Sequence, residues 1–308
     1  MRLLEITTKI GCSNYCKYCP QELLIKTYTK KSKKIFLSFE DFSNILDKIP
    51  KDVTISFCGF CEPFLNPQCS EMIQLASSKG YNILIYTTLV GMNLKDVEIL
   101  KKISPEIFCI HLPGNNGREN ILVNEDYLKV MTALLKSKIY LTFDSFGDLN
   151  PQVKDLLDSF DIPPEVYMSD KREVNNRAGN LKFSKTLNKG RGPLTCLNNR
   201  LEGNVLLPNG DVVLCCMDYN LSTKLGNLLE QDYEDLFKSK EFLSLKHKLS
   251  IGGEGTLCKS CEWGVYSDLA NSPRFKLKKN MFELKRKIRY VLIKTGFGRK
   301  ILKISKKL

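Results

Sequence analysis

The sequence contains little histidine and no long apolar segment. Only two of its 308 residues are histidine, His111 and His247, which argues against a site where imidazole nitrogens hold zinc or iron. It has no run of about 18 apolar residues, roughly the length that spans a bilayer. The first residues, MRLLEITTKIG, mix polar and apolar side chains, so a signal peptide is not expected. The expected location is the cytoplasm.

Acidic residues are nearly missing from the C-terminal tail, residues 274–308. The tail holds 14 Lys and Arg residues and one acidic residue, Glu283, whereas basic and acidic residues balance elsewhere. Apolar residues recur at helical spacing between Met281 and Ile293, which predicts a basic amphipathic helix. Such a helix suits docking on the protein's own surface or peripherally on the inner face of an anionic membrane. RNA is the less favoured partner.

Strand-like and helix-like segments alternate through the first half of the chain. This alternation predicts βαβ units around a parallel sheet, with the functional site at the carboxyl ends of the strands. The expected strands are 3–8, 53–57, 82–88, 106–112 and 138–143, and the expected helices lie near 38–48, 70–79, 93–102, 125–136 and 151–160. Beyond an irregular connector, the sequence predicts a hairpin at 204–216 and a helix at about 233–249.

Cysteine is abundant, with twelve residues. In a reducing compartment so many thiols are more often metal ligands than disulfide partners. Three of them, Cys12, Cys16 and Cys19, form a CxxxCxxC triad on the loop after the first expected strand. Three such thiolates can hold three irons of a [4Fe–4S] cluster and leave the fourth iron open. A zinc knuckle is the alternative, and it requires a fourth ligand nearby.

The second half holds another ordered set of cysteines. Cys196 precedes the expected hairpin, Cys215 ends it, and Cys258 and Cys261 form a later CxxC. Four thiols make a closed ligand set for [4Fe–4S] or for zinc. Cys216 is the alternative to Cys215, but neighbours on a strand point to opposite faces.

The triad, with Tyr18 between its last two cysteines, resembles the radical S-adenosylmethionine superfamily. Residues 59–67, GFCEPFLNP, are similar to the family's Gly-Gly-Glu-Pro-like segment, with Cys61 where a second glycine is usual. Thr87 and Thr88 resemble the family's third-strand segment, often Thr-Asn. The resemblance implies that S-adenosylmethionine contacts Tyr18, Gly59, Glu62, Pro63, Thr87 and Thr88. Cys58 and Cys61 also form a CxxC, whose alternative readings are a metal or redox site and simple packing.

The later cysteines resemble the auxiliary-cluster extension called SPASM, in its shortened "twitch" form with one cluster. The resemblance implies a partial (β/α)6 TIM-like barrel over residues 1–190. A small C-terminal α+β auxiliary iron–sulfur domain follows over 191–270, and then the basic tail at 271–308. Implied cofactors are two [4Fe–4S] clusters and S-adenosylmethionine.

The same resemblance implies an enzyme that reductively cleaves S-adenosylmethionine and abstracts a hydrogen atom from its substrate, served by an external donor such as flavodoxin or ferredoxin. The first expected strand begins at about Leu3 and leaves no room for the peptide-recognition domain of many peptide-maturing members. This favours dehydrogenation or epimerisation of a carbohydrate-like or other small polar substrate. Modification of a peptide, modification of RNA, and a zinc-holding scaffold without activity are the alternatives.

Two further residues are candidates for catalysis. His111 ends an expected strand in the segment His-Leu-Pro-Gly, which places it at the predicted site face. Arg177 lies in Asn-Arg-Ala-Gly-Asn-Leu, which resembles a segment found just before the SPASM part of related proteins. A guanidinium at this position can bind an oxyanion with two hydrogen bonds. The simpler alternatives are a structural histidine and a surface arginine.

Overall fold

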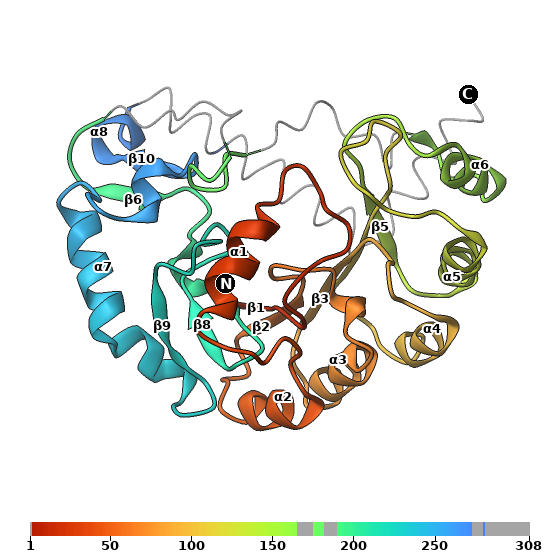
Figure 1. Cartoon of the computed structure of the whole chain (residues 1–308), viewed down its shortest axis with the longest axis horizontal. Coiled ribbons are helices and arrows are strands. Elements are labelled where there is room, and N and C mark those ends of the chain that lie inside the picture. Colours follow the sequence, from red (N-terminus) through yellow and green to blue (C-terminus); the bar gives the residue numbers. More distant parts are fainter. Residues whose placement is uncertain (1, 165–174, 182–189, 273–279, 281–308) are drawn as a thin grey trace.

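The computed structural model describes residues 2–164, 175–181, 190–272 and 280. A parallel sheet in the order β5-β4-β3-β2-β1 forms its centre, and helices α2 to α6 form an arc outside that sheet (Figure 1). The strands are β1 (Leu3–Ile6), β2 (Thr54–Phe57), β3 (Ile83–Thr87), β4 (Ile107–His111) and β5 (Leu141–Asp144). The helices are α2 (Phe39–Leu46), α3 (Cys69–Ser78), α4 (Leu94–Leu100), α5 (Glu125–Lys136) and α6 (Pro151–Ser159). The fold is a partial α/β barrel.

The elements expected in the first half are confirmed. Ser38 caps α2 by accepting a hydrogen bond from the backbone N–H of Asp41, as the sequence indicates. One further helix, α1 (Gln21–Thr29), follows the first cysteine loop and was not expected. Five β/α units lie within the described residues, and the place of a sixth, after α6, falls largely outside them. In the same ranges, no helix has the length and apolar character needed to cross a membrane.

The second half of the chain extends the same sheet. Strand β7 (Gly203–Leu206) pairs in parallel with β1, and β8 (Asp211–Val213) and β9 (Lys224–Asn227) continue from it in antiparallel order. The expected hairpin is thereby confirmed. The helix expected at 233–249 is divided into a 3₁₀ helix, η4 (Tyr233–Lys238), and α7 (Lys240–Ser250), because Ser239 caps α7. The predicted domain boundary at residue 190 stays a prediction. The eight-stranded sheet contains strands from both sides of this residue.

A smaller sheet lies beside α7. It consists of β6 (Leu194–Cys196) and β10 (Gly264–Tyr266), which pair in antiparallel order and place Cys196 opposite Gly264. The short helices η5 (Leu257–Ser260) and α8 (Ser267–Ala270) flank β10. These elements are far from β5 in Figure 1, at the opposite end of the molecule. Apart from position 280, the basic tail 274–308 lies outside the described residues.

The two faces of the parallel sheet differ in chemistry. Successive strand residues point to opposite faces, and one set, which includes Ile6, Ile85 and Ile110, packs against the helices in the main hydrophobic core. The alternate set is largely polar, whereas both faces of a parallel sheet are usually apolar. Its polar members are Glu5, Thr54, Ser56, Tyr86, His111, Thr142 and Asp144, and its other members are Leu3, Leu84, Ile107 and Cys109. The inner side of this barrel is therefore built for polar contacts.

Asn66 fixes the loops at the carboxyl ends of β1 and β2. Its buried side-chain amide donates to the carbonyl oxygens of Thr8 and Leu37, at 2.9 and 2.8 Å, and its oxygen accepts from the backbone N–H of Gln68. The residue thus joins three segments that are far apart in the sequence. These bonds hold the loop after β2 against the loop after β1, which carries the first cysteines.

Candidate functional site

The first cysteine triad lies between β1 and α1. Cys12, Cys16 and Cys19 are free thiols, and all three are half-buried. Burial, together with the nearby Cys19 and Cys12, raises the pKa of Cys16 to about 12. Cys19 Sγ is 3.0 Å from Tyr219 Oη and accepts from Gln21 Nε2 at 3.3 Å. The three thiols are close enough to influence one another, as ligands of one cluster must be.

Glu62 is fully enclosed by hydrogen-bond donors. Its Oε1 accepts from Thr87 Oγ1 at 2.7 Å and from the backbone N–H of Phe64 at 3.2 Å. Its Oε2 accepts from the backbone N–H and the hydroxyl of Thr88, at 2.6 and 2.7 Å. Asn14, from the cysteine loop, donates to the same Thr88 hydroxyl at 2.8 Å. The structure therefore brings together the predicted residues Glu62, Thr87 and Thr88 beside the triad.

Gly59 and Pro63 flank this carboxylate. Gly59 has a φ of +55°, and a Cβ there would lie 2.8 Å from the backbone nitrogen of Thr7, so a larger residue cannot fit. Pro63 begins the 3₁₀ helix η1 (Pro63–Leu65), and its carbonyl accepts from Thr8 Oγ1 at 2.8 Å. Close packing of the loops after β1 and β2 thus explains both residue types.

His111 and Tyr18 belong to a half-buried network that includes two carboxylates. Tyr18 Oη is 3.2 Å from His111 Nε2 and donates to Glu119 Oε1 at 3.0 Å. His111 lies 3.4 Å from that oxygen through Nε2, and 3.9 Å from Asp144 Oδ2 through Nδ1. Burial alone would lower the pKa of His111, but hydrogen bonds with Asp144 and Glu119 outweigh it and raise this pKa above its usual value. A protonated imidazole is therefore favoured here.

Arg177 is half-buried and contacts the cysteine loop. Its Nε donates to the carbonyl oxygen of Tyr18 at 3.2 Å, and its guanidinium carbon is 5.8 Å from the centre of the Tyr219 ring. The prediction placed Arg177 at the site on a resemblance alone. The structure puts it next to the triad, between the two halves of the chain.

Arg200 and Glu5 form an ion pair on the inner side of the barrel. Arg200 donates to Glu5 Oε1 at 2.6 Å, and only 5% of the surface of Glu5 is exposed. Cys58 and Cys216 lie within the electrostatic reach of Glu5. Tyr86 is 41% exposed although it occupies a central strand, so the interior is open beside it. This pair connects β1 to the segment before β7.

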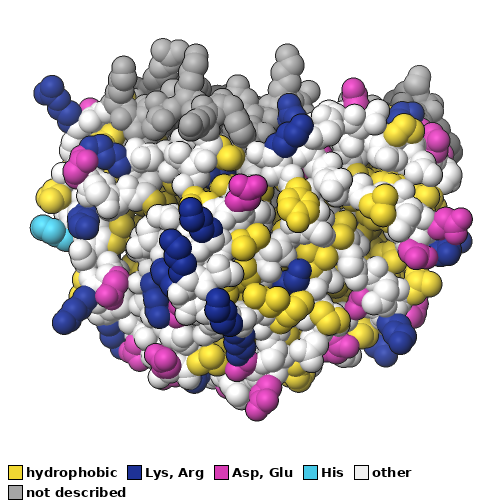
Figure 2. All heavy atoms as spheres, in the orientation of Figure 1, with side chains coloured by type: hydrophobic (Ala, Val, Ile, Leu, Met, Phe, Trp, Pro, Cys, Tyr) yellow, Lys and Arg dark blue, Asp and Glu magenta, His cyan; other side chains and the backbone are white. Residues whose placement is uncertain are grey.

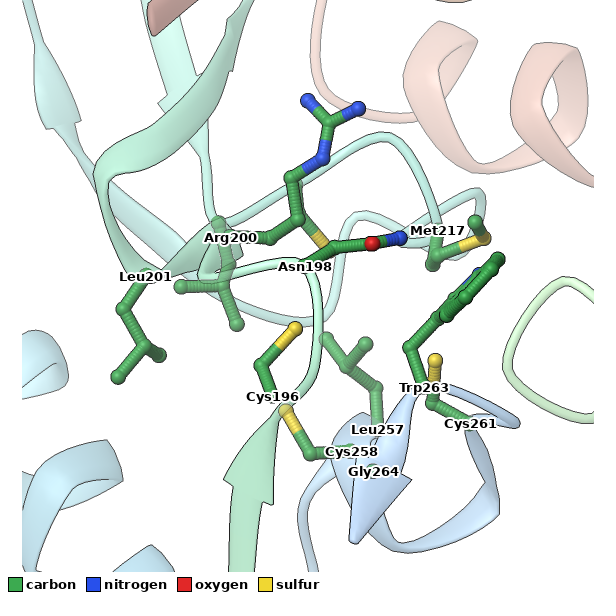
Figure 3. A pocket seen from close by; sticks show the side chains of 12 residues that line it. Cys196, Asn198, Arg200, Leu201, Met217, Leu257, Cys258, Cys261, Trp263 and Gly264 are labelled. Atoms are coloured by element: carbon green, nitrogen blue, oxygen red, sulfur yellow. The ribbon is translucent and has the colours of Figure 1, made fainter. Parts of the chain in front are cut away.

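The four later cysteines surround one cavity. Cys196, Cys215, Cys258 and Cys261 all line a cavity of about 490 Å³, part of it open to solvent. In Figure 3, the side chains of Cys196, Cys258 and Cys261 surround this space, and the guanidinium of Arg200 points away from it. Cys216 does not line the cavity and instead lies near Glu5 and Arg200. The two neighbouring cysteines thus face different spaces, although β8 ends at Val213 and neither lies within the strand that the sequence argument assumed.

Both cysteine sets consist of free thiols, the donors that iron–sulfur clusters use. No group of three or more His, Cys, Asp or Glu side chains within the described ranges is placed to hold one metal ion. A cubane cluster spreads its ligands over different irons, so its thiolates need not converge on one point. The donor chemistry, all thiols on short loops, fits [4Fe–4S] in both places.

Sequence reasoning missed several residues of the site. Glu5 was detectable as an acid within an apolar strand, and Asp144 as an acid at a strand end. Arg200 and Tyr219 reach Glu5 and Cys19 across about 200 positions of sequence, and Glu119 reaches Tyr18 across about 100, so no local pattern predicts these contacts.

Comparisons with known proteins agree with this architecture. Residues 196–262 match the SPASM family model, an iron–sulfur cluster-binding domain. A curated relative from Niallia circulans, an S-adenosyl-L-methionine-dependent 2-deoxy-scyllo-inosamine dehydrogenase, is 24% identical over 263 residues, covering 84% of this chain and 92% of the relative.

Two solved structures share the fold. BtrN in complex with AdoMet and 2-DOIA aligns with a TM-score of 0.56 and 18% identity, over 85% of this chain and 92% of that one. The enzyme anSMEcpe with AdoMet and the Cp18Cys peptide aligns with a TM-score of 0.56 and 12% identity, over 90% and 87% of the two chains. The chain thus contains a SPASM iron–sulfur cluster-binding domain and is similar, along most of its length, to radical S-adenosylmethionine enzymes.

Proposed function

We propose that this enzyme removes a hydrogen atom from a small polar, carbohydrate-like substrate bound inside the barrel, and thereby dehydrogenates or epimerises it. The observation that carries the proposal is the polar inner face of the parallel sheet. Charged and hydroxyl groups, among them Glu5, Tyr86 and Arg200, lie near one another on this side, and Tyr86 is 41% exposed there. Such groups match the many hydroxyl or amino groups of a cyclitol or sugar.

We propose Cys12, Cys16 and Cys19 as ligands of the first cluster, and the four thiols around the cavity as ligands of the auxiliary cluster. When bound, these groups and S-adenosylmethionine supply one-electron chemistry: cleavage of the sulfonium, hydrogen-atom abstraction and acceptance of a surplus electron. Arg200 supports a substrate position between the two sites, because it lines the auxiliary cavity and reaches Glu5 in the interior.

The role we propose for Glu62 is to build the cofactor loop. A carboxylate has about four lone-pair sites, and protein donors already occupy four positions on Glu62. The carboxylate therefore fixes residues 59–63 and the end of β3, and the contacts to S-adenosylmethionine fall to the backbone of this loop and to Tyr18. Thr87 and Thr88 act through Glu62 in this arrangement.

Oxidation of an alcohol to a carbonyl removes one hydrogen atom, one proton and one electron. We propose that the network of His111, Tyr18, Glu119 and Asp144 handles the proton, since it combines an imidazole with two carboxylates at the carboxyl ends of β4 and β5. Arg177 orients the cysteine loop and offers its charge to a substrate oxygen.

An acidic one-electron carrier of the flavodoxin or ferredoxin type is the proposed reductant. Lys26, Lys30, Lys31 and Lys33 are exposed on α1 and the turn after it, directly after the cysteine loop. Basic side chains gather around this position on the face shown in Figure 2. Complementary charge accelerates such encounters and orients the partner.

The relative's substrate class provides the first test of function. After anaerobic reconstitution and reduction with dithionite, we expect 2-deoxy-scyllo-inosamine or a related cyclitol to stimulate 5′-deoxyadenosine formation and to lose two hydrogens by mass spectrometry. Deuterium on the oxidised carbon should appear in 5′-deoxyadenosine. A short cysteine- or serine-containing peptide is the control. Turnover of the peptide but of no cyclitol would favour the alternative, a peptide-modifying enzyme, whose fold anSMEcpe shares.

The pair Cys215 and Cys216 tests the auxiliary ligand set. Cys215→Ala should reduce the iron content of the reconstituted protein from about eight to about four per chain, because a closed site loses a ligand. Cys216→Ala is the matched control and should keep about eight, since its thiol lies outside the cavity. The reverse result would assign Cys216 to the cluster.

The charge state of His111 tests the proposed proton network. Glu119→Gln should lower the pKa of His111, because the carboxylate that favours the imidazolium is lost while burial remains. Histidine NMR titration of the oxidised, reconstituted protein can follow this directly, since His111 and His247 are the only histidines. His247 is exposed on α7 and serves as the internal reference. An unchanged His111 titration would remove Glu119 from the network.

We also propose that the tail binds an anionic membrane surface. Its 14 basic residues and single acid are concentrated in 35 positions, and each Lys or Arg near such a surface contributes about 1 kcal/mol. The full chain should sediment with phosphatidylserine-rich liposomes, and deletion of 274–308 should abolish this. Phosphatidylcholine liposomes are the control. Equal sedimentation of both chains would disprove the proposal.

A further inference from the structure

We infer that Tyr219 donates a hydrogen bond to the sulfur of Cys19 and thereby raises the reduction potential of the cluster at the first triad. The inference rests on the proposed ligand role of Cys19. It assigns a redox-tuning role in the N-terminal site to a residue of the SPASM segment, so that the two halves of the chain share one function.

The contact itself is short and shielded from water. Tyr219 Oη lies 3.0 Å from Cys19 Sγ, and only 3% of the surface of Tyr219 is exposed. A thiolate bound to iron carries no proton and can only accept, so the phenol is the donor. Gln21, two residues after Cys19, also donates to this sulfur, through Nε2 at 3.3 Å.

Packing holds the phenol in this position. The ring of Tyr219 lies 4.8 Å from the ring of Phe60, centre to centre, at an angle of 59°. Arg177 lies over it at 5.8 Å. Tyr219 and Phe60 belong to one buried apolar cluster, against which Cys19 itself packs. Packing of the ring therefore keeps its hydroxyl beside the sulfur of Cys19.

The segment that carries Tyr219 also carries Cys215. The backbone N–H of Asp218 donates to the carbonyl of Cys215 at 3.0 Å. The Asp218 carboxylate in turn accepts from the backbone N–H groups of Ser222 and Thr223, each at 2.8 Å. One hydrogen-bonded segment thus places the thiol of Cys215 at the auxiliary cavity and the phenol of Tyr219 at the first triad.

The sign of the effect follows from charge. Reduction adds an electron to the cluster and increases the negative charge on its sulfur ligands. A donor to such a sulfur stabilises the reduced form more than the oxidised form, and hydrogen bonds to sulfur are one of the factors that set cluster potentials. Removal of the phenol should therefore make the cluster harder to reduce.

The experiment compares Tyr219→Phe with a matched tyrosine in the same apolar cluster. Tyr28 is also buried, and its hydroxyl donates to the carbonyl of Lys34 at 2.5 Å, away from the cysteines. Full-length proteins are reconstituted anaerobically. Their clusters are then reduced stepwise in a potentiometric titration, and EPR measures the fraction reduced at each potential. The signal that changes on addition of S-adenosylmethionine identifies the first cluster.

For Tyr219→Phe we expect the equilibrium constant for reduction of this cluster to fall about tenfold, equivalent to about 59 mV for a one-electron couple. Tyr28→Phe should leave it unchanged, although it also loses a buried hydrogen bond. Gln21→Leu, which removes the second donor, should shift the potential in the same direction as Tyr219→Phe and provides an independent test if that variant folds poorly.

Two results would overturn the inference, and they can be told apart. If the first cluster assembles with full iron content in Tyr219→Phe and titrates as in the unaltered protein, the hydrogen bond has no tuning role. If the unaltered protein shows no signal that responds to S-adenosylmethionine, the proposed ligand set fails first and the inference fails with it.

Discussion

The backbone pairing of β1 with β7 is the interaction on which the rest of the site depends. Four residues of each strand lie in parallel register, from Leu3 opposite Gly203 to Ile6 opposite Leu206. The bond from the Thr7 N–H to the Leu206 carbonyl extends the pairing into the cysteine loop. Without this pairing, the second half of the chain would have no fixed position relative to the first triad.

Three contacts across the molecule follow from it. Arg200 precedes β7 and reaches Glu5 on β1, Tyr219 follows β8 and reaches Cys19, and Cys215 occupies the auxiliary cavity on the outer side. The barrel interior is therefore closed on one side by groups from the SPASM part. A substrate held there has the S-adenosylmethionine loops on one side and the auxiliary cavity on the other.

Much of the fold was predictable because the pattern is local. Alternating apolar segments, the cap at Ser38 and the spacing of Cys12, Cys16 and Cys19 each involve only a few neighbouring residues. Helix α1 escaped prediction because Ile25, Thr27 and Thr29 are branched at Cβ and disfavour a helix, whereas burial of Leu24 and Tyr28 stabilises it. The Arg200–Glu5 and Tyr219–Cys19 contacts join residues about 200 positions apart, so no local pattern contains them.

The four donors on Glu62 have a consequence for how the cofactor is recognised. Because the protein alone satisfies this carboxylate, the loop after β2 and the end of β3 adopt their shape before any small molecule arrives. Binding of a small molecule to this loop then requires little further ordering of the chain. The conformational entropy that a flexible site loses on binding is here lost on folding. If the loop binds S-adenosylmethionine as proposed, a few backbone contacts on this rigid loop can supply the affinity.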